Sequence, residues 1–130
     1  SSFAGIVGTS VFKAFDMDVG RTGLTEKEAK IEGIDYTANT IDSVSRSSYY
    51  PGASSIRIKL IAERKTGKLL GAQVAGKDAA AKRIDVLAAA ITAGMTAHEI
   101  NNLDLGYSPP FGPVFDPVLI AAGELWKKIQ

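Results

Sequence analysis

The stretch that decides the fold class runs from residue 56 to residue 75: Ile-Arg-Ile-Lys-Leu-Ile-Ala-Glu-Arg-Lys-Thr-Gly-Lys-Leu-Leu-Gly-Ala-Gln-Val-Ala. Residues 56–63 alternate between apolar and polar, and this period of two predicts a strand with one buried face. The residues that share the apolar face are Ile56, Ile58, Leu60 and Ala62. Lys65–Lys68 then reads as a hairpin loop in which Gly67 supplies a positive φ, and residues 69–75 return as a second strand.

Further strands are predicted upstream of this hairpin. Residues 9–15 are rich in β-formers, and residues 16–23 hold a turn with a second short strand. Thr25 and Glu28 form a capping box, which predicts a helix of about two turns. Residues 34–46 carry enough β-branched and aromatic side chains to form another strand.

The second half of the chain changes to a helical period. Residues 78–93 are rich in alanine and predict a helix, and Thr96 with Glu99 forms a second capping box. Asp116-Pro117 has the residue types that open a helix, with Asp at the cap and Pro in the first turn. Strands come first and helices later, so we expect an α+β fold with three to five antiparallel strands and helices packed on them.

Composition excludes several classes of function. The chain has 130 residues, which suits one domain, and a net charge of +1 from 15 basic and 14 acidic residues. This balance lacks the basic surface that nucleic-acid binding requires. No apolar run approaches the roughly 20 residues of a membrane helix. The sequence contains no cysteine, which is compatible with a reducing compartment, and we expect a cytoplasmic protein.

Three short motifs resemble catalytic or cofactor sites but lack required residues. Gly71–Lys77 matches most of a phosphate-binding loop, yet Asp78 stands where Ser or Thr should bind magnesium. His98 is the only histidine, so a histidine-rich metal site is impossible, and we expect it on a helix surface. Gly5 and Gly8 precede a strand instead of following one, which is the wrong order for a dinucleotide fingerprint. We therefore expect no catalytic, metal or cofactor site within this chain.

Two aromatic loops remain as candidates for contact with a partner. The first is Tyr49-Tyr50-Pro51-Gly52, and the second is Tyr107-Ser108-Pro109-Pro110-Phe111. Tyrosine in a stiff loop offers an apolar face and a hydroxyl, and such residues are enriched in interfaces. The same side chains could equally plug the ends of the sheet core, and the residues alone leave both readings open.

The sequence resembles a known family at the second loop and just after it. Tyr107–Phe111 and Asp116–Val118 are similar to the Tyr-x-Pro-Pro-Phe and Asp-Pro-Val signature that closes NADH oxidases, NADH peroxidases and CoA-disulfide reductases. Other stretches resemble the same C-terminal domain in the same order: Gly8-Thr9, Lys13–Asp16, Thr22–Glu26, Tyr49–Ala53, Lys59–Ile61, Thr66–Gln73 and Lys82–Ala88. The resemblance covers nearly the whole chain from Gly8 onward.

This resemblance implies a fold, partners and cofactors. Residues 8–130 would be the C-terminal dimerisation domain of a flavin-dependent pyridine nucleotide–disulfide oxidoreductase, and residues 1–7 a linker or a remnant of one. The FAD-binding and NAD(P)H-binding domains, with the redox cysteine, would precede it, so that FAD and NAD(P)H belong to the parent protein and not to this chain alone. The domain would pair with its own copy in a homodimer.

The resemblance also implies a role for the aromatic loops. In CoA-disulfide reductase relatives, tyrosines of this domain reach the partner subunit's active site, and the matching positions are Tyr49 or Tyr50 and Tyr107. Pro109, Pro110 and Phe111 would belong to the interface loop. The parent substrate stays open among oxygen, peroxide, CoA disulfide and polysulfide. The alternative function is a stand-alone domain that binds a small ligand or a partner without catalysis.

Overall fold

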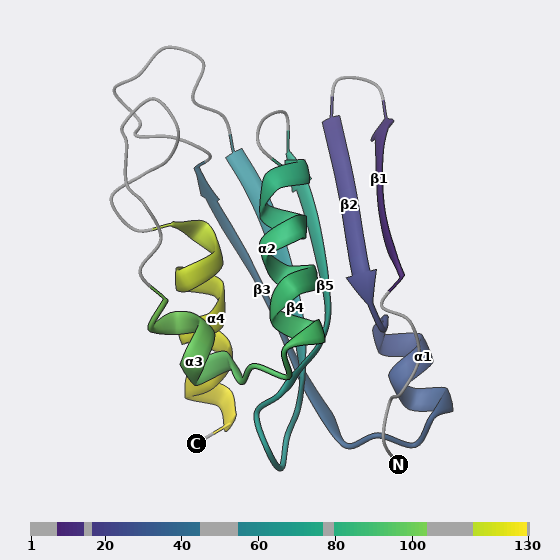
Figure 1. The fold of residues 1–130 in the computed structure, drawn as a ribbon, viewed down its shortest axis with the longest axis vertical. Coiled ribbons are helices and arrows are strands. Elements are labelled where there is room, and N and C mark those ends of the chain that lie inside the picture. Colours follow the sequence, from purple (N-terminus) through teal and green to yellow (C-terminus); the bar gives the residue numbers. More distant parts are fainter. Residues whose placement is uncertain (1–7, 15–16, 45–54, 77–79, 104–115, 130) are drawn as a thin grey trace.

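A computed structural model describes residues 8–14, 17–44, 55–76, 80–103 and 116–129. Within these ranges the chain forms one five-stranded sheet with helices packed on it (Figure 1). The strands are β1 (Thr9–Ala14), β2 (Met17–Gly23), β3 (Tyr36–Val44), β4 (Ser55–Glu63) and β5 (Leu69–Gly76). The helices are α1 (Glu26–Ile31), α2 (Ala80–Thr92), α3 (Ala97–Asn101) and α4 (Pro117–Ile129). The predicted α+β class is confirmed, and the strand number is the upper end of the expected range.

The sheet is antiparallel throughout, and its strand order is β1-β2-β5-β4-β3. The predicted hairpin of β4 and β5 therefore forms its centre, with β2 pairing on one side and β3 on the other. In the loop of that hairpin, Gly67 has a φ of 77°, as its position predicted.

One face of the sheet carries the hydrophobic core. Helix α2 packs on β2 and β5, helix α4 packs on β3 and β4, and α3 packs against α4. Figure 1 shows α2 lying along the sheet and α4 beside it over the β3 side. The alternation of β4 places Ile56, Ile58, Leu60 and Ala62 in this core, where they are at most 1% exposed. Their main helical partners are Ile84, Leu87, Ala90, Val118, Ala122 and Leu125.

Among the described residues, only those at one end cover the opposite face of the sheet, called here the open face. Helix α1 lies there, where Leu24 approaches β5 so closely that a Cβ on Gly71 would stand 1.8 Å from the Leu24 carbonyl oxygen. Glycine is required at this position because only a bare Cα admits the neighbouring backbone. Ile61, on the same side of β4 as Arg57 and Lys59, is fully buried under this cover.

The structure differs from the sequence prediction mainly at β2. The segment after residue 15 was expected to hold a turn and a short strand, yet Met17–Gly23 is a seven-residue strand paired on both sides. Gly20 of this strand allows α2 to pack closely, because a Cβ at this position would lie 3.1 Å from the Ile84 side chain. The other element bounds fall within about two residues of expectation, which is the usual uncertainty of helix and strand ends. None of the helices in the described ranges has the length and apolarity that crossing a membrane requires.

Candidate functional site

Strands β3 and β5 end, and strands β2 and β4 begin, at the same end of the sheet, which is the upper end in Figure 1. Gly76, which ends β5, pairs with residues near the start of both β2 and β4. Val44, which ends β3, pairs with Ser55, which starts β4. The described residues on either side of Tyr49 and Tyr50 in the chain, Val44 and Ser55, therefore lie at this end. Both tyrosines lie outside the described residues, so their predicted contacts remain a prediction.

The described residues that follow the second aromatic segment in the chain begin helix α4. Asp116 caps this helix, since its Oδ1 accepts a hydrogen bond from the Val118 backbone N–H at 2.8 Å. Its Oδ2 lies 3.7 Å from Nη2 of Arg83, which belongs to the first half of α2 and is 4% exposed. The start of α4 is thus held next to the start of α2. The other predicted residues of this loop lie outside the described ranges: Tyr107, Pro109, Pro110 and Phe111.

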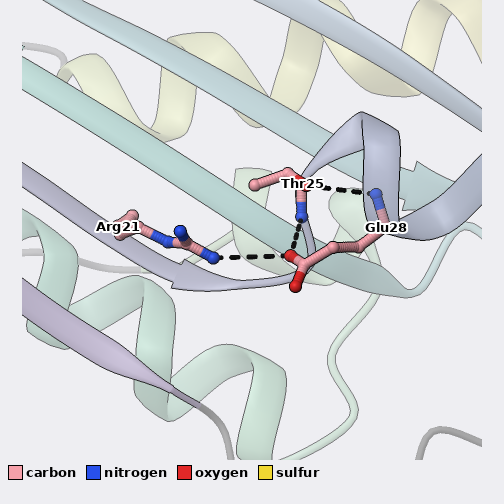
Figure 2. Close-up of polar contacts among 3 residues, drawn as sticks. All are labelled: Arg21, Thr25 and Glu28. Atoms are coloured by element: carbon pink, nitrogen blue, oxygen red, sulfur yellow. Dashed lines mark hydrogen bonds and ion pairs between the residues drawn. The ribbon is translucent and has the colours of Figure 1, made fainter.

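Charged residues fasten α1 to the open face. Lys59 of β4 donates a hydrogen bond to Glu26 of α1, and this bond is the main reason that the pKa of Glu26 lies below its usual value. Figure 2 shows the neighbouring corner, where Glu28 accepts from the Thr25 backbone N–H at 2.9 Å and from Arg21 at 3.4 Å. The Thr25 backbone N–H is likewise the first cause of the lowered pKa of Glu28. The predicted capping box is confirmed, and it stabilises the start of α1 at the lower end of the open face in Figure 1.

The rest of the open face is uncovered by described residues and has two chemically different halves. At the β1–β2 side, Phe12 and Met17 are 53% and 40% exposed. At the β3–β4 side, Arg57 donates to both carboxylate oxygens of Asp42, at 2.9 and 3.2 Å, and lowers the pKa of that carboxyl. A shallow hollow of about 240 Å³ lies between the halves, lined by Val19, Thr40, Arg57, Lys59, Gln73, Val74 and Ala75.

The described ranges contain no group of three acidic, histidine or cysteine side chains placed to hold a metal ion. His98 lies exposed on α3, as expected, and its ring stacks at 4.8 Å on that of Trp126. The part of the phosphate-loop lookalike from Gly71 to Gly76 is strand β5, which confirms the hairpin interpretation. The open face combines an exposed apolar patch with ordered charges, and such a surface suits contact with a macromolecule.

Two features of this geometry were not predicted from the sequence. The Arg83–Asp116 pair joins residues far apart in the chain, and only the capping role of Asp116 carried a local signal. The exposure of Phe12 and Met17 depends on which face of β1 and β2 helix α2 covers, and the strand pattern alone does not tell this.

Comparison with known proteins now identifies the family. Residues 9–118 match the family model of the pyridine nucleotide-disulphide oxidoreductase dimerisation domain. The chain belongs to this family.

Individual relatives agree with this assignment. The chain is 44% identical over 120 residues to the NAD(P)H coenzyme A polysulfide/persulfide reductase of Pyrococcus horikoshii, which covers 92% of this chain and 27% of the relative. It is 33% identical over 130 residues to an NADH oxidase of Methanocaldococcus jannaschii, covering all of this chain and 29% of the relative. In the solved structure of an NAD-dependent persulfide reductase from A. fulgidus, the matching part gives a TM-score of 0.93 at 44% identity, covering 97% of this chain and 24% of that one.

The predicted family and fold are thereby confirmed. The chain spans between a quarter and a third of the length of the curated relatives named above. The activity of a whole enzyme, its substrate and its cofactors therefore belong to the proposal that follows.

Proposed function

We propose that this chain is the homodimerisation domain of an FAD-dependent NAD(P)H oxidoreductase and that it completes the active site of its partner subunit. The observation that carries the proposal is the match of residues 9–118 to the dimerisation-domain family. In this proposal residues 8–130 form the domain and residues 1–7 a linker, while FAD and NAD(P)H are held by the parent protein's other domains.

The exposed apolar patch on β1 and β2 supports self-association. Phe12 and Met17 stand on the open face and are about half exposed, so burial of the remainder in a contact would contribute about 0.7–1.5 kcal/mol each. A twofold-symmetric contact uses the same patch on both copies, so one exposed patch is sufficient for a homodimer.

The aromatic loops supply the proposed chemistry. Tyr49 or Tyr50, and Tyr107 in the loop with Pro109, Pro110 and Phe111, reach the partner's reacting atoms. An unperturbed tyrosine has a pKa of about 10, so its hydroxyl is protonated at neutral pH and can donate to a departing thiolate. The anchors of both segments support this role, because β3, β4 and the Arg83 contact of α4 lie toward the same end of the domain.

The proposed substrate class is a CoA-type disulfide or persulfide. It is supported by the similarity to the polysulfide/persulfide reductase and by the tyrosines, whose hydroxyls suit a thiolate leaving group. A cytoplasmic location belongs to the same proposal, since that compartment keeps thiols reduced and disulfide reductases work there.

A tyrosine substitution tests the catalytic part of the proposal. In the flavoprotein encoded by the whole reading frame, Tyr107→Phe is expected to lower turnover of CoA disulfide by roughly 10²-fold, the lower range for loss of a general acid. Tyr36→Phe is the matched control, because Tyr36 lies on β3 and is expected to leave turnover unchanged. Unchanged turnover in Tyr107→Phe would remove the proposed role of that hydroxyl.

Light scattering tests the dimerisation part. The 130-residue chain is expected to show a mass that rises with concentration toward twice 13.7 kDa. Phe12→Asp should shift the protein toward the monomer, whereas Ile31→Asp, at a 75% exposed site on α1, should not. A strictly monomeric chain that binds yellow flavin by itself would instead favour a stand-alone ligand-binding domain.

A further inference from the structure

The two edge strands of the sheet, β1 and β3, differ in how their outward backbone groups are satisfied. On the β3 side, the Asp35 carbonyl faces β4, where it accepts from the Arg64 N–H, and carbonyls along a strand alternate in direction. The Tyr36 and Ala38 carbonyls therefore point outward. They accept hydrogen bonds from the Arg64 guanidinium and from Lys128 Nζ, each at 2.9 Å. Side chains of the same chain thus occupy part of the β3 edge.

Strand β1, at the other edge of the sheet, presents three residues outward. The Gly8 carbonyl accepts a hydrogen bond from the Gly23 N–H of β2 and therefore faces inward. The same alternation turns the backbone N–H and C=O groups of Thr9, Val11 and Lys13 away from β2. Among the described residues, none forms a hydrogen bond with these outward groups. An edge of this kind is a template for another strand.

The side chains of β1 are only partly covered on both faces of the sheet. Phe12 lies on the open face and is 53% exposed. Val11 lies opposite Gly20, on the face that carries α2, and is 43% exposed. Edge strands normally prevent pairing by charges, proline or bulges. Strand β1 has one charged residue, Lys13, no proline, and an unbroken register with β2, so its edge is open to pairing.

We propose that β1 is the seam of the homodimer: it pairs antiparallel with β1 of a second copy, and the two sheets join into one. The inference rests on the proposed function and names the surface through which the dimer forms. The family supports a second copy as the occupant, because its matching model describes a dimerisation domain. Two identical strands that pair antiparallel are also related by a twofold axis, so each satisfies the outward groups of the other.

The outward groups select one register for this pairing. When the pair is centred on Val11, Thr9 stands opposite the second copy's Lys13, and all three outward residues of each strand exchange hydrogen bonds. A shift of two residues in either direction leaves one outward residue opposite a position outside β1. The charges agree with the central register, because Lys13 faces a threonine and keeps its 3.2 Å pair with Asp18. Phe12 then lies diagonally across from the second copy's Phe12, within reach of an aromatic contact.

A proline at the centre of β1 tests the seam in the 130-residue chain. Val11→Pro removes an N–H that points away from β2, and proline is tolerated at such edge positions. Light scattering should show the dissociation constant of the dimer raised roughly tenfold or more, because each dimer loses two central hydrogen bonds. Thr40→Pro is the matched control, since the Thr40 N–H also points outward, on the β3 edge, and it should leave the dissociation constant unchanged. Urea unfolding checks that both variants remain folded.

A disulfide test does not depend on the proline variant. The chain contains no cysteine, so Val11→Cys introduces a single thiol. In the proposed register the two Cα atoms at position 11 lie about 5.5 Å apart, inside the range that a disulfide spans. Mild oxidation should therefore link most of the Val11→Cys dimer, whereas Thr40→Cys should stay monomeric on a non-reducing gel.

Two results would overturn the inference while leaving the homodimer itself intact. One is a folded Val11→Pro chain that dimerises with the affinity of the parent. The other is a Val11→Cys chain that dimerises without forming the disulfide. A parent chain that stays monomeric at every concentration would instead remove the self-association on which this inference rests. The failure of the seam and the failure of the proposed function are therefore distinguishable.

Discussion

Strand β5 approaches Leu24 so closely that Gly71→Ala creates the shortest contact of any glycine-to-alanine substitution in the described ranges. The new Cβ would lie 1.8 Å from the Leu24 carbonyl oxygen, 2.8 Å from its carbon and 2.9 Å from its nitrogen. All three are backbone atoms, so no change of side-chain rotamer relieves the contact. The backbone of Leu24 has to withdraw from β5.

The size of the effect follows from that movement. To reach even a 3.0 Å contact, the Leu24 oxygen must move by 3.0 − 1.8 = 1.2 Å. Such a shift removes the 2.9 Å hydrogen bond from the Leu24 N–H to the Leu70 carbonyl and disturbs the pairing of Gly23 with Gly71. We assign about 1 kcal/mol to each of one or two lost hydrogen bonds. Partial exposure of Leu24 adds roughly 1–2 kcal/mol. The lower entropy of unfolded alanine offsets about 0.4–1 kcal/mol, which leaves a net loss of about 1–3.5 kcal/mol.

Urea unfolding of the 130-residue chain measures this loss. The midpoint should fall by roughly 0.5–2 M for a domain of this size. Gly8→Ala is the control, because no atom lies within 4 Å of its added Cβ, and it should stay within about 0.5 kcal/mol of the parent. A Gly71→Ala protein as stable as this control would refute the packing of α1 against the sheet.

Three further outcomes are expected. Thr25→Ala should cost about 1 kcal/mol in chemical unfolding because it removes the cap of α1, whereas Thr40→Ala on the exposed side of β3 should cost less than about 0.5 kcal/mol. Glu28 has a lowered pKa, so its contribution is present above the unfolded value near 4.5 and is lost as pH falls through the lower folded value. Glu28→Gln should therefore flatten the fall in stability below about pH 4.5 in acid unfolding, and an unchanged slope would contradict the capping contact. Ile84→Ala should cost about 2–5 kcal/mol by thermal and urea unfolding, since Ile84 is fully buried, whereas Ile120→Ala at a 38% exposed site should cost far less.

The parts of the fold that depend on neighbours in sequence were predictable. Thr25 with Glu28 and Thr96 with Glu99 form capping boxes in the structure because the partners are only one helical turn apart. The alternation of residues 56–63 also fixed which side of β4 enters the core.

The parts that depend on distant contacts were not predictable in the same way. Ile61 shares its side of β4 with Arg57 and Lys59, and its complete burial is not indicated by the alternation of the strand. Arg83 lies in an alanine-rich helix and is 4% exposed, and its pairing with Asp116 joins residues that are far apart in the chain. The family resemblance depended on several short motifs that follow one another in the same order as in the family. The roles of Tyr49, Tyr50 and Tyr107 remain predictions because these residues lie outside the described ranges.

Subunit hybrids test most directly whether this domain serves its partner's active site. Two variants of the whole flavoprotein would be unfolded together and reassembled: one with Tyr107→Phe, the other with its redox cysteine replaced. If the tyrosine acts across the dimer, each hybrid regains one complete site, and random pairing should restore about a quarter of the parent turnover. If turnover stays at the level of the separate variants while light scattering shows that hybrids have formed, the domain does not complete its partner's site.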